Sequence, residues 1–173
     1  MNKAKRLVEQ LSAENAASLC AALGDPDAQA TPKQQAAYID AMLNTADRMG
    51  ICMKDSMRKC GGCCLTADIV EDAKALYAKA DGMAEFLTLL NAADIGGGNL
   101  HLSDGKIIGT YQTCYCDIPW QVEKIHKGYC ECSAGWYMGL FSAVLGKPVT
   151  VTLIDSIANG AAQCTFEISG VEV

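Results

Sequence analysis

The segment SAGWYMGLFSAVLGKPVTVTLIDSI, residues 133–157, contains a helix signal followed directly by a strand signal. Its first half carries apolar residues at helical spacing, with Ser133 as the expected N-cap, and the turn from Gly146 to Pro148 ends the helix. Over residues 149–153, valine and leucine alternate with threonine, which is typical of a half-buried strand. The segment therefore predicts a helix that packs on a sheet.

Further strands are predicted on both sides of this segment. A turn at Asn159–Gly160 leads into CTFEI, residues 164–168, where Cys164, Phe166 and Ile168 share one face. Upstream, two short apolar runs flank Asp104–Gly105, a hairpin pattern within residues 99–116. The glycines of IGGG, residues 95–98, are interpreted as a flexible lead into that hairpin. Together these signals indicate an antiparallel sheet.

The first half of the chain is predicted to be helical. Helical spacing of leucines covers residues 3–23, and Thr31 followed by Pro32 predicts a helix from there to Arg48. Thr66 and Asp81 are the expected caps of two more helices. The fold class is therefore α+β, a helical N-terminal half followed by an antiparallel sheet with packed helices. Residues 1–95 form a helical lead-in and residues 96–173 an α+β domain, packed as one globular unit.

Composition excludes several classes of protein. The 173 residues are 50% hydrophobic and 20% charged, and the net charge of −6 comes with scattered lysines and arginines. Nucleic-acid binding requires a basic surface, and none is indicated. No run approaches the ~18 apolar residues of a membrane span, and polar residues interrupt any signal peptide near the N-terminus. We expect a cytoplasmic protein with no nucleic-acid or membrane partner.

Ten cysteines are the strongest chemical signal. In a reducing cytosol, clustered cysteines favour metal binding or catalysis over disulfides. The Cys114/Cys116 and Cys130/Cys132 pairs each place two sulfurs on one face if they lie in strands. Four such thiolates suit zinc or, equally, an iron–sulfur cluster. Inert buried thiols are the alternative.

A second cysteine motif, KCGGCC at residues 59–64, has three interpretations. Its cysteines are additional metal ligands, a redox pair whose thiolate is stabilised by the helix that follows, or structural residues. Cys60 and Cys64 are four residues apart and face one site if the helix begins early.

Neither histidine provides a clear catalytic signal. His101 falls in the predicted hairpin, and His126, four residues before Cys130, is either a metal ligand or a solvated surface residue. The chain has no HExxH, GxSxG or Walker pattern, so no specific enzyme class is indicated.

The segment YCECSAGWYMGLFSAVLGKPVTVTLIDSIANGAAQCTFEI, residues 129–168, resembles the 4-vinyl reductase domain family, in a cysteine-rich uncharacterised bacterial branch. The motifs that carry the resemblance are GKPV at residues 146–149 and NGAAQCTF at residues 159–166. The resemblance implies a small α+β ligand-binding fold, shared with vesicle-tethering subunits and haem-based gas sensors. It also implies a small-molecule-binding module with a zinc ion held by cysteines.

Carried over onto this chain, the family's zinc ligands fall on Cys130 and Cys164. Ser156 stands where the family's middle cysteine is expected, so Cys132, Cys114 or Cys116 would have to replace that thiolate. The N-terminal half has no counterpart in the minimal domain. It resembles the helical lead-in of uncharacterised bacterial relatives and of the aminothiazoline-carboxylate hydrolase-like group.

These observations lead to three functional hypotheses. The first is a sensor or carrier that binds a small apolar or aromatic molecule, with Trp136, Tyr137 and Phe141 lining the pocket. The second is an enzyme that uses the thiols, a zinc hydrolase or an iron–sulfur redox protein. The third is a homodimerising interaction module. The predicted metal ligands are Cys114, Cys116, Cys130, Cys132, Cys164, Cys60 and Cys64.

Overall fold

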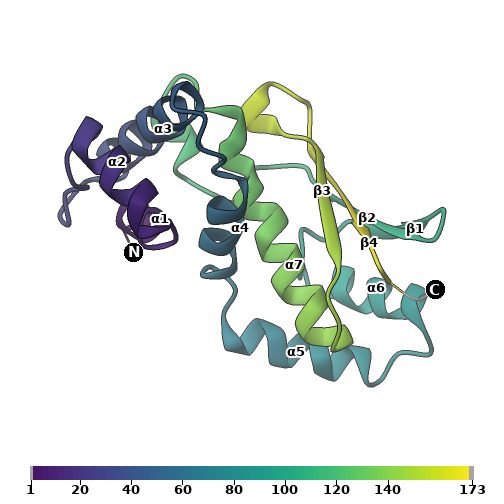
Figure 1. Cartoon of the computed structure of the whole chain (residues 1–173). Coiled ribbons are helices and arrows are strands. Elements are labelled where there is room, and N and C mark those ends of the chain that lie inside the picture. Colours follow the sequence, from purple (N-terminus) through teal and green to yellow (C-terminus); the bar gives the residue numbers. More distant parts are fainter. Residues whose placement is uncertain (1, 172–173) are drawn as a thin grey trace.

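The computed structural model of the protein describes residues 2–171, and across this range it contains seven α-helices and one four-stranded sheet (Figure 1). The helices are α1 (Lys3–Glu9), α2 (Ala13–Leu23), α3 (Pro32–Arg48), α4 (Lys54–Gly62), α5 (Ala67–Tyr77), α6 (Met83–Ala92) and α7 (Glu131–Leu145). The strands are β1 (Leu100–Ser103), β2 (Lys106–Tyr111), β3 (Thr150–Asp155) and β4 (Cys164–Ser169). The short 3-10 helices are η1 (Pro119–Gln121), η2 (Lys127–Cys130) and η3 (Ile157–Asn159).

The sheet is antiparallel throughout, with the strand order β1-β2-β4-β3. Asp104 and Gly105 both have positive φ angles, of 49° and 73°, which lets the two-residue turn join β1 to β2. In β4, buried and half-buried residues alternate, so Cys164, Phe166 and Ile168 point into the core. This strand pairs with β2 on one side and with β3 on the other, and therefore joins the β1–β2 hairpin to β3.

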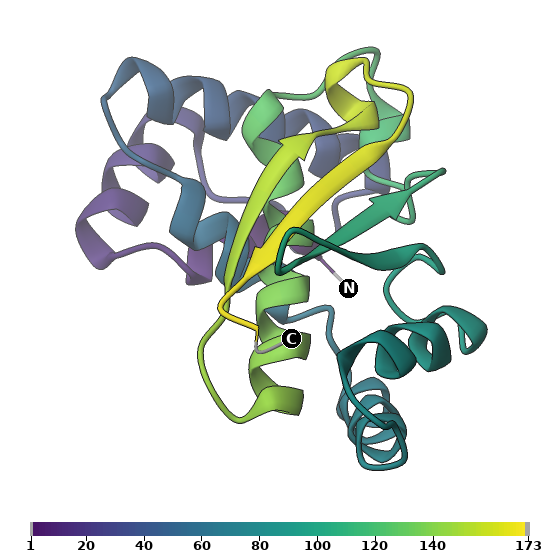
Figure 2. The ribbon, with the colours of Figure 1, turned by 90° about the vertical axis from the view of Figure 1, so that its right-hand side faces the viewer.

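Helix α7 lies along one face of the sheet, and Figure 2 shows it behind β3 and β4. Its residues Tyr137, Leu140 and Phe141 are fully buried in a core that also contains the inner face of the sheet, α5 and α6. Gly146, with a φ angle of 67°, ends the helix in the left-handed conformation. The helix is thus the central element between the sheet and the N-terminal helices (Figure 1).

A second hydrophobic core lies on the other side of α7. Helices α1, α2, α3 and α4 share it with residues of the 116–132 segment, including Ile118, Ile125 and Tyr129. The two cores do not divide at the expected boundary of residues 95 and 96. Helices α5 and α6 pack with the sheet, whereas the segment before α7 packs with the N-terminal helices. The two halves are therefore interlocked.

Several local predictions are confirmed by the structure. Helix α3 begins at Pro32 after Thr31, and Thr31 and Gln34 form a complete capping box. The Asp104–Gly105 hairpin is present, and the helix–Gly146–strand sequence is as expected. Thr66 occupies the N-cap position of α5, but its side chain makes no capping hydrogen bond. The α+β fold class is likewise confirmed.

Other local predictions are wrong. The helix expected over residues 3–23 is two helices, because Ser12 caps α2 and interrupts the first. Gly82 rather than Asp81 precedes α6, and α7 begins at Glu131, so Ser133 lies inside the helix. Neither Cys-x-Cys pair is in a strand. Cys114 and Cys116 lie in the loop after β2, and Cys130 and Cys132 lie where η2 passes into α7.

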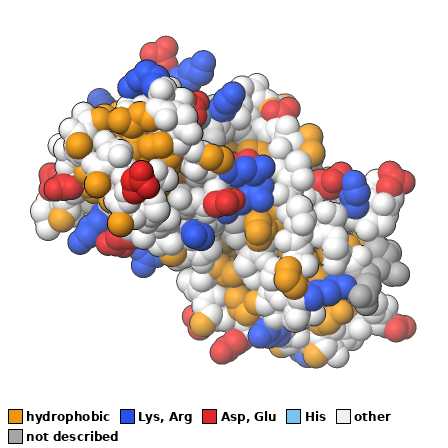
Figure 3. All heavy atoms as spheres, viewed as in Figure 1, with side chains coloured by type: hydrophobic (Ala, Val, Ile, Leu, Met, Phe, Trp, Pro, Cys, Tyr) orange, Lys and Arg blue, Asp and Glu red, His pale blue; other side chains and the backbone are white. Residues whose placement is uncertain are grey.

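The surface in Figure 3 mixes acidic and basic side chains without a continuous basic area on that face. Among residues 2–171, no helix combines the length and the apolar character that crossing a membrane requires.

Candidate functional site

A pocket of about 280 Å³ opens where the start of α7 faces the end of β2 and the turn between α6 and β1. Six thiols and four aromatic side chains contribute to its wall. The lining thiols are Cys64, Cys114, Cys116, Cys130, Cys132 and Cys164, and the aromatic residues are Tyr111, Tyr115, Tyr129 and Trp136. Most of the cysteines singled out by their spacing therefore meet at one place.

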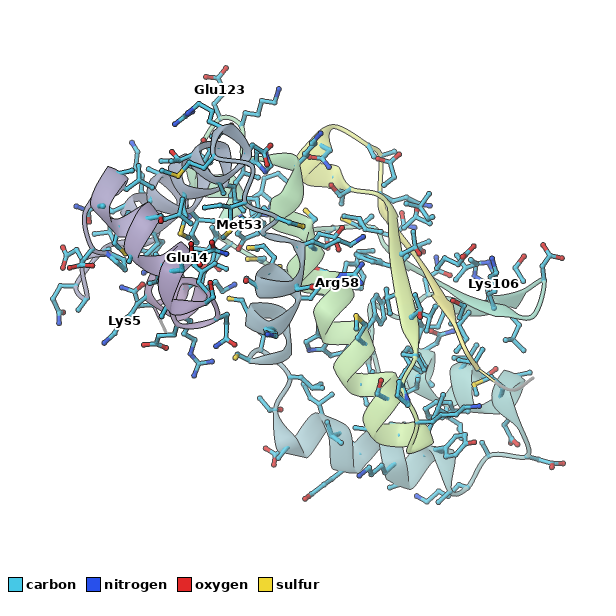
Figure 4. The ribbon with its side chains drawn as sticks, viewed as in Figure 1. Lys5, Glu14, Met53, Arg58, Lys106 and Glu123 are labelled. Atoms are coloured by element: carbon cyan, nitrogen blue, oxygen red, sulfur yellow. The ribbon has the colours of Figure 1, made fainter. Side chains whose placement is uncertain are left out.

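A close crossing of α4 and α7 brings the KCGGCC motif to this pocket. An atom added at the Cβ position of Gly61 would lie 1.7 Å from the Cys132 carbonyl oxygen, and one at Gly135 would lie 1.9 Å from the Arg58 carbonyl oxygen. Arg58 extends from α4 beside this crossing (Figure 4) and donates hydrogen bonds to Glu131 and to the Val151 carbonyl. The glycines thus allow Cys60 and Cys64 to approach Cys132.

Cys60, Cys64 and Cys132 also share a smaller cavity of about 20 Å³, with Lys3 and Tyr129 in its wall. A cavity of this size holds about one water molecule. Cys60 and Cys64 were expected to face one site if they shared the start of a helix. Both line this cavity, but Cys60 lies in the last turn of α4 and not at the start of the next helix.

The turn between α6 and β1 forms the opposite wall of the main pocket. Gly96, Gly97 and Gly98 all have positive φ angles, of 79°, 88° and 66°. A Cβ atom at Gly97 would lie 2.4 Å from the Tyr111 ring, and the buried Tyr137 hydroxyl donates a 2.8 Å hydrogen bond to the Gly96 carbonyl. Side chains are excluded from this turn by both backbone conformation and space. The triglycine segment therefore builds a pocket wall.

Cys130 and Cys164 line one end of the pocket, and Ser156 lies beside Cys130. The thiol of Cys164 accepts a 3.3 Å hydrogen bond from the Ile157 backbone N–H. Ser156 is fully buried, and its hydroxyl has no hydrogen-bond partner of ordinary geometry in the described chain, yet it lies near enough to lower the pKa of Cys130. The hydroxyl thus faces the Cys130 thiol without a full hydrogen bond.

Burial keeps most of the pocket thiols protonated. Together with the charges of neighbouring cysteines, it raises the pKa of Cys130 and of Cys60 to about 11. Burial also raises the pKa of Cys132 well above its ordinary value, and those of Cys114 and Cys164 to a smaller extent. No three His, Cys, Asp or Glu side chains within residues 2–171 form a group arranged to hold a metal ion. The thiols line one pocket without converging on one point.

These raised pKa values predict slow alkylation of the buried thiols. At pH 8, iodoacetamide should modify Cys60 and Cys130 at least about tenfold more slowly than the exposed Cys52 and Cys63, because the thiolate is the nucleophile. The rates at Cys60 and Cys130 should rise about tenfold per pH unit until pH 11. Peptide mass spectrometry measures each rate separately. Equal rates at pH 8 would contradict the burial that raises these pKa values.

The aromatic residues predicted to line the pocket divide into two groups. Trp136 is part of the pocket wall, whereas Tyr137 and Phe141 are fully buried in the core behind it. Sequence reasoning missed Tyr111, Tyr115 and Tyr129. Tyr115 and Tyr129 directly adjoin predicted cysteines, so the aromatic residues interleaved with the cysteine motifs were an available signal.

Both histidines lie outside the thiol pocket. His101 is exposed on β1, and the His126 ring nitrogen Nε2 lies 3.0 Å from the Asp47 carboxylate. His126 Nδ1 accepts a hydrogen bond from the Gly128 backbone N–H, and its own backbone N–H donates to Asp40. His126 therefore has a structural role at the start of η2, and neither histidine lines the pocket beside a thiol.

Fold and site together define an α+β domain with a cysteine- and tyrosine-lined pocket at the start of its central helix. The chain belongs to the family of unknown function DUF6144, whose model matches residues 4–172. Comparison with curated protein sequences gives no match.

Two solved structures are distantly similar over most of the chain. The phenol-responsive sensory domain of the transcription activator PoxR with phenol is 14% identical, with a TM-score of 0.47, over 91% of this chain and 90% of that one. An H-NOX protein from S. oneidensis in the Fe(II)NO ligation state is 12% identical, with a TM-score of 0.40, over 94% and 92%. Both are too distant to indicate what this chain binds.

Proposed function

We propose that this protein is a small-molecule-binding domain with a sensor or carrier role, and that its ligand occupies the pocket beside Trp136. The observation that carries the proposal is the pocket itself, whose wall is mainly aromatic rings and thiols with few charged groups. Ligand sites are typically apolar concavities with a few placed polar groups, and drug-sized ligands occupy about 300–1,000 Å³. At about 280 Å³, this pocket suits a molecule of roughly one ring.

Tryptophan fluorescence tests this proposal. The chain has two tryptophans, and Trp120 is 61% exposed, so a Trp120→Phe protein retains Trp136 as the reporter in the pocket wall. We expect saturable quenching or a spectral shift with at least one of benzamide, benzoate, hexanamide and hexanoate. Ser133 lines the pocket, so Ser133→Leu in the same background should abolish the response by filling the space.

Ser103→Leu at the exposed tip of the hairpin is the matched control and should bind like the Trp120→Phe protein. Thermal unfolding checks that both leucine variants remain folded. The proposed pocket function would be overturned if the fluorescence response persists in the Ser133→Leu variant. It would also be overturned if none of the four compounds gives a response in the Trp120→Phe protein.

We further propose that a zinc ion is held at the Cys130 end of the pocket as a structural component. Two features support this site: besides burial, the charges of Cys164 and Cys114 raise the pKa of the Cys130 thiol, and Ser156 supplies a buried hydroxyl without a hydrogen-bond partner in the described residues. A divalent cation would relieve the repulsion between these thiolates. At the other end of the pocket, the positive charge of Lys3 lies beside Cys116 and Cys132 and disfavours the binding of a second cation there.

Elemental analysis of anaerobically purified protein tests the metal proposal. We expect about one zinc per chain, lost in a Cys130→Ser/Cys164→Ser double variant and retained in Cys60→Ser. Ser156→Cys should tighten zinc binding, because a thiolate replaces a poor ligand. Zinc that persists in the double variant, or metal-free protein, would refute this site. Iron with sulfide absorption would instead support the alternative of an iron–sulfur redox enzyme.

A further inference from the structure

Lys3 is held in the wall of the pocket although it is far from the other lining residues in sequence. It is the first residue of α1, and its backbone N–H donates a 2.9 Å hydrogen bond to the side chain of Gln35 on α3. Gln35 is buried and in turn donates to the Ala30 carbonyl. Asn2 caps the same helix by accepting from the Lys5 backbone N–H. The start of α1 is therefore anchored, and the half-buried Lys3 side chain reaches both thiol-lined cavities.

The ammonium group of Lys3 has a weak partner. Its Nζ donates a 2.9 Å hydrogen bond to the Cys116 sulfur, which also lies 2.9 Å from the Tyr129 hydroxyl. An ammonium has three donors, and a neutral thiol is a weak acceptor. No carboxylate within residues 2–171 forms an ion pair with Lys3, whereas Lys54, Lys106 and Arg58 each pair with a glutamate.

A partly buried charge without a counter-ion is unfavourable, because desolvation is not offset by an ion pair. The ordinary pKa of a lysine lies well above 7, so the Lys3 side chain is an ammonium at neutral pH. The other charged lining residue, Asp94, is exposed on the opposite wall and is solvated there.

We propose that the pocket takes a small hydrophobic carboxylate and that Lys3 binds its carboxylate group. The apolar part of the ligand would contact Trp136 and Tyr111, and the carboxylate would accept hydrogen bonds from the Lys3 ammonium, whose remaining donors are available. The inference rests on the proposed small-molecule-binding function and adds the chemical class of the ligand. A charge-assisted hydrogen bond between an ammonium and a carboxylate is roughly twice as strong as one between neutral groups.

A competing explanation of the same contact is that Cys116 is itself the counter-ion of Lys3, as a thiolate. The two explanations differ in what they predict for anionic ligands. A thiolate would neutralise Lys3 and repel a carboxylate, so acids would gain nothing over neutral molecules. Removing the thiol with Cys116→Ser would then create a preference for acids that the unsubstituted protein lacks.

The test compares acids with their matching amides, benzoate with benzamide and hexanoate with hexanamide, by isothermal titration calorimetry at pH 7.5. Within each pair, shape and apolar surface are nearly constant, and only the charge changes. We expect the acid to bind about tenfold tighter than the amide or better. Lys3→Met should remove this preference while amide binding persists, which shows that the pocket remains folded.

Lys5→Met is the matched control, since Lys5 is exposed on the same helix (Figure 4) and is not among the residues that line the pocket. It should keep the acid preference, as should Cys116→Ser. Equal binding of acid and amide to the unsubstituted protein, or a preference that survives Lys3→Met, would overturn the role of Lys3 and leave the proposed pocket function intact. A preference that appears only in Cys116→Ser would identify Cys116 as the counter-ion. If neither member of any pair binds, the pocket function fails as well.

Discussion

Replacing Gly61 with alanine is expected to lower the free energy of unfolding by about 3 kcal/mol or to prevent folding. A methyl group at this position would lie 1.7 Å from the Cys132 backbone oxygen, and side-chain rotation cannot relieve a clash with backbone. Helices α4 and α7 would have to separate, which would also move Cys60 and Cys64 away from Cys132. Urea denaturation followed by circular dichroism measures the effect.

Gly62→Ala is the matched control for this substitution. Gly62 is the next residue of α4, and nothing lies within 4 Å of its Cβ position. Alanine is favoured over glycine within a helix by roughly 0.5–1 kcal/mol, so this variant should be as stable as the unsubstituted protein or slightly more stable. If Gly61→Ala and Gly62→Ala have the same stability, the close helix crossing is not as described.

Replacing Arg58 with methionine should have the second-largest effect, a loss of about 2–3 kcal/mol in the free energy of unfolding. Arg58 donates 2.8 Å hydrogen bonds to Glu131 on α7 and to the Val151 carbonyl on β3, so one side chain joins α4, α7 and the sheet. The Arg58 and Glu131 side chains are only 14% and 17% exposed. Methionine would fill similar space but leave the Glu131 charge without its main partner.

The control for Arg58 is Lys54→Met. Lys54 lies 3.8 Å from the same carboxylate but is 52% exposed, and exposed ion pairs contribute little to stability. Its loss should change the unfolding free energy by no more than about 0.5 kcal/mol. A double-mutant cycle with Glu131→Gln isolates the Arg58–Glu131 coupling. Equal effects of the Arg58 and Lys54 substitutions would contradict the buried linking role of Arg58.

Predictions based on contacts between close neighbours in sequence agreed best with the structure. The Thr31 cap, the Asp104–Gly105 turn and the alternation in CTFEI each depend on residues within a few positions of one another, and all three are present. The predicted start of α7 failed because a tertiary contact outweighed a local preference. Ser133 is a good N-cap residue, but α7 packs closely against α4 and begins at Glu131.

The candidate site was predicted only in part. The two Cys-x-Cys pairs indicated one shared site, whereas the role of the KCGGCC motif stayed open; in the structure six cysteines, including Cys64 of that motif, line one pocket. Their geometry was not predictable, because strand alternation was assumed for segments that are loop and helix start. Trp136, Tyr137 and Phe141 are all aromatic residues of α7, and the sequence does not distinguish among them. The orientation of α7 about its axis places Trp136 in the pocket wall and the other two in the core.

The sequence by itself determined the fold class, the strands of the sheet and the richness in thiols, since each depends on local periodicity, turn residues or composition. The tertiary structure alone decided that α4 and α7 cross at Gly61 and Gly135, and that the anchored Lys3 meets Cys116, 113 residues away. Such contacts depend on how whole helices pack, and no local pattern encodes the distance between elements that are remote along the chain.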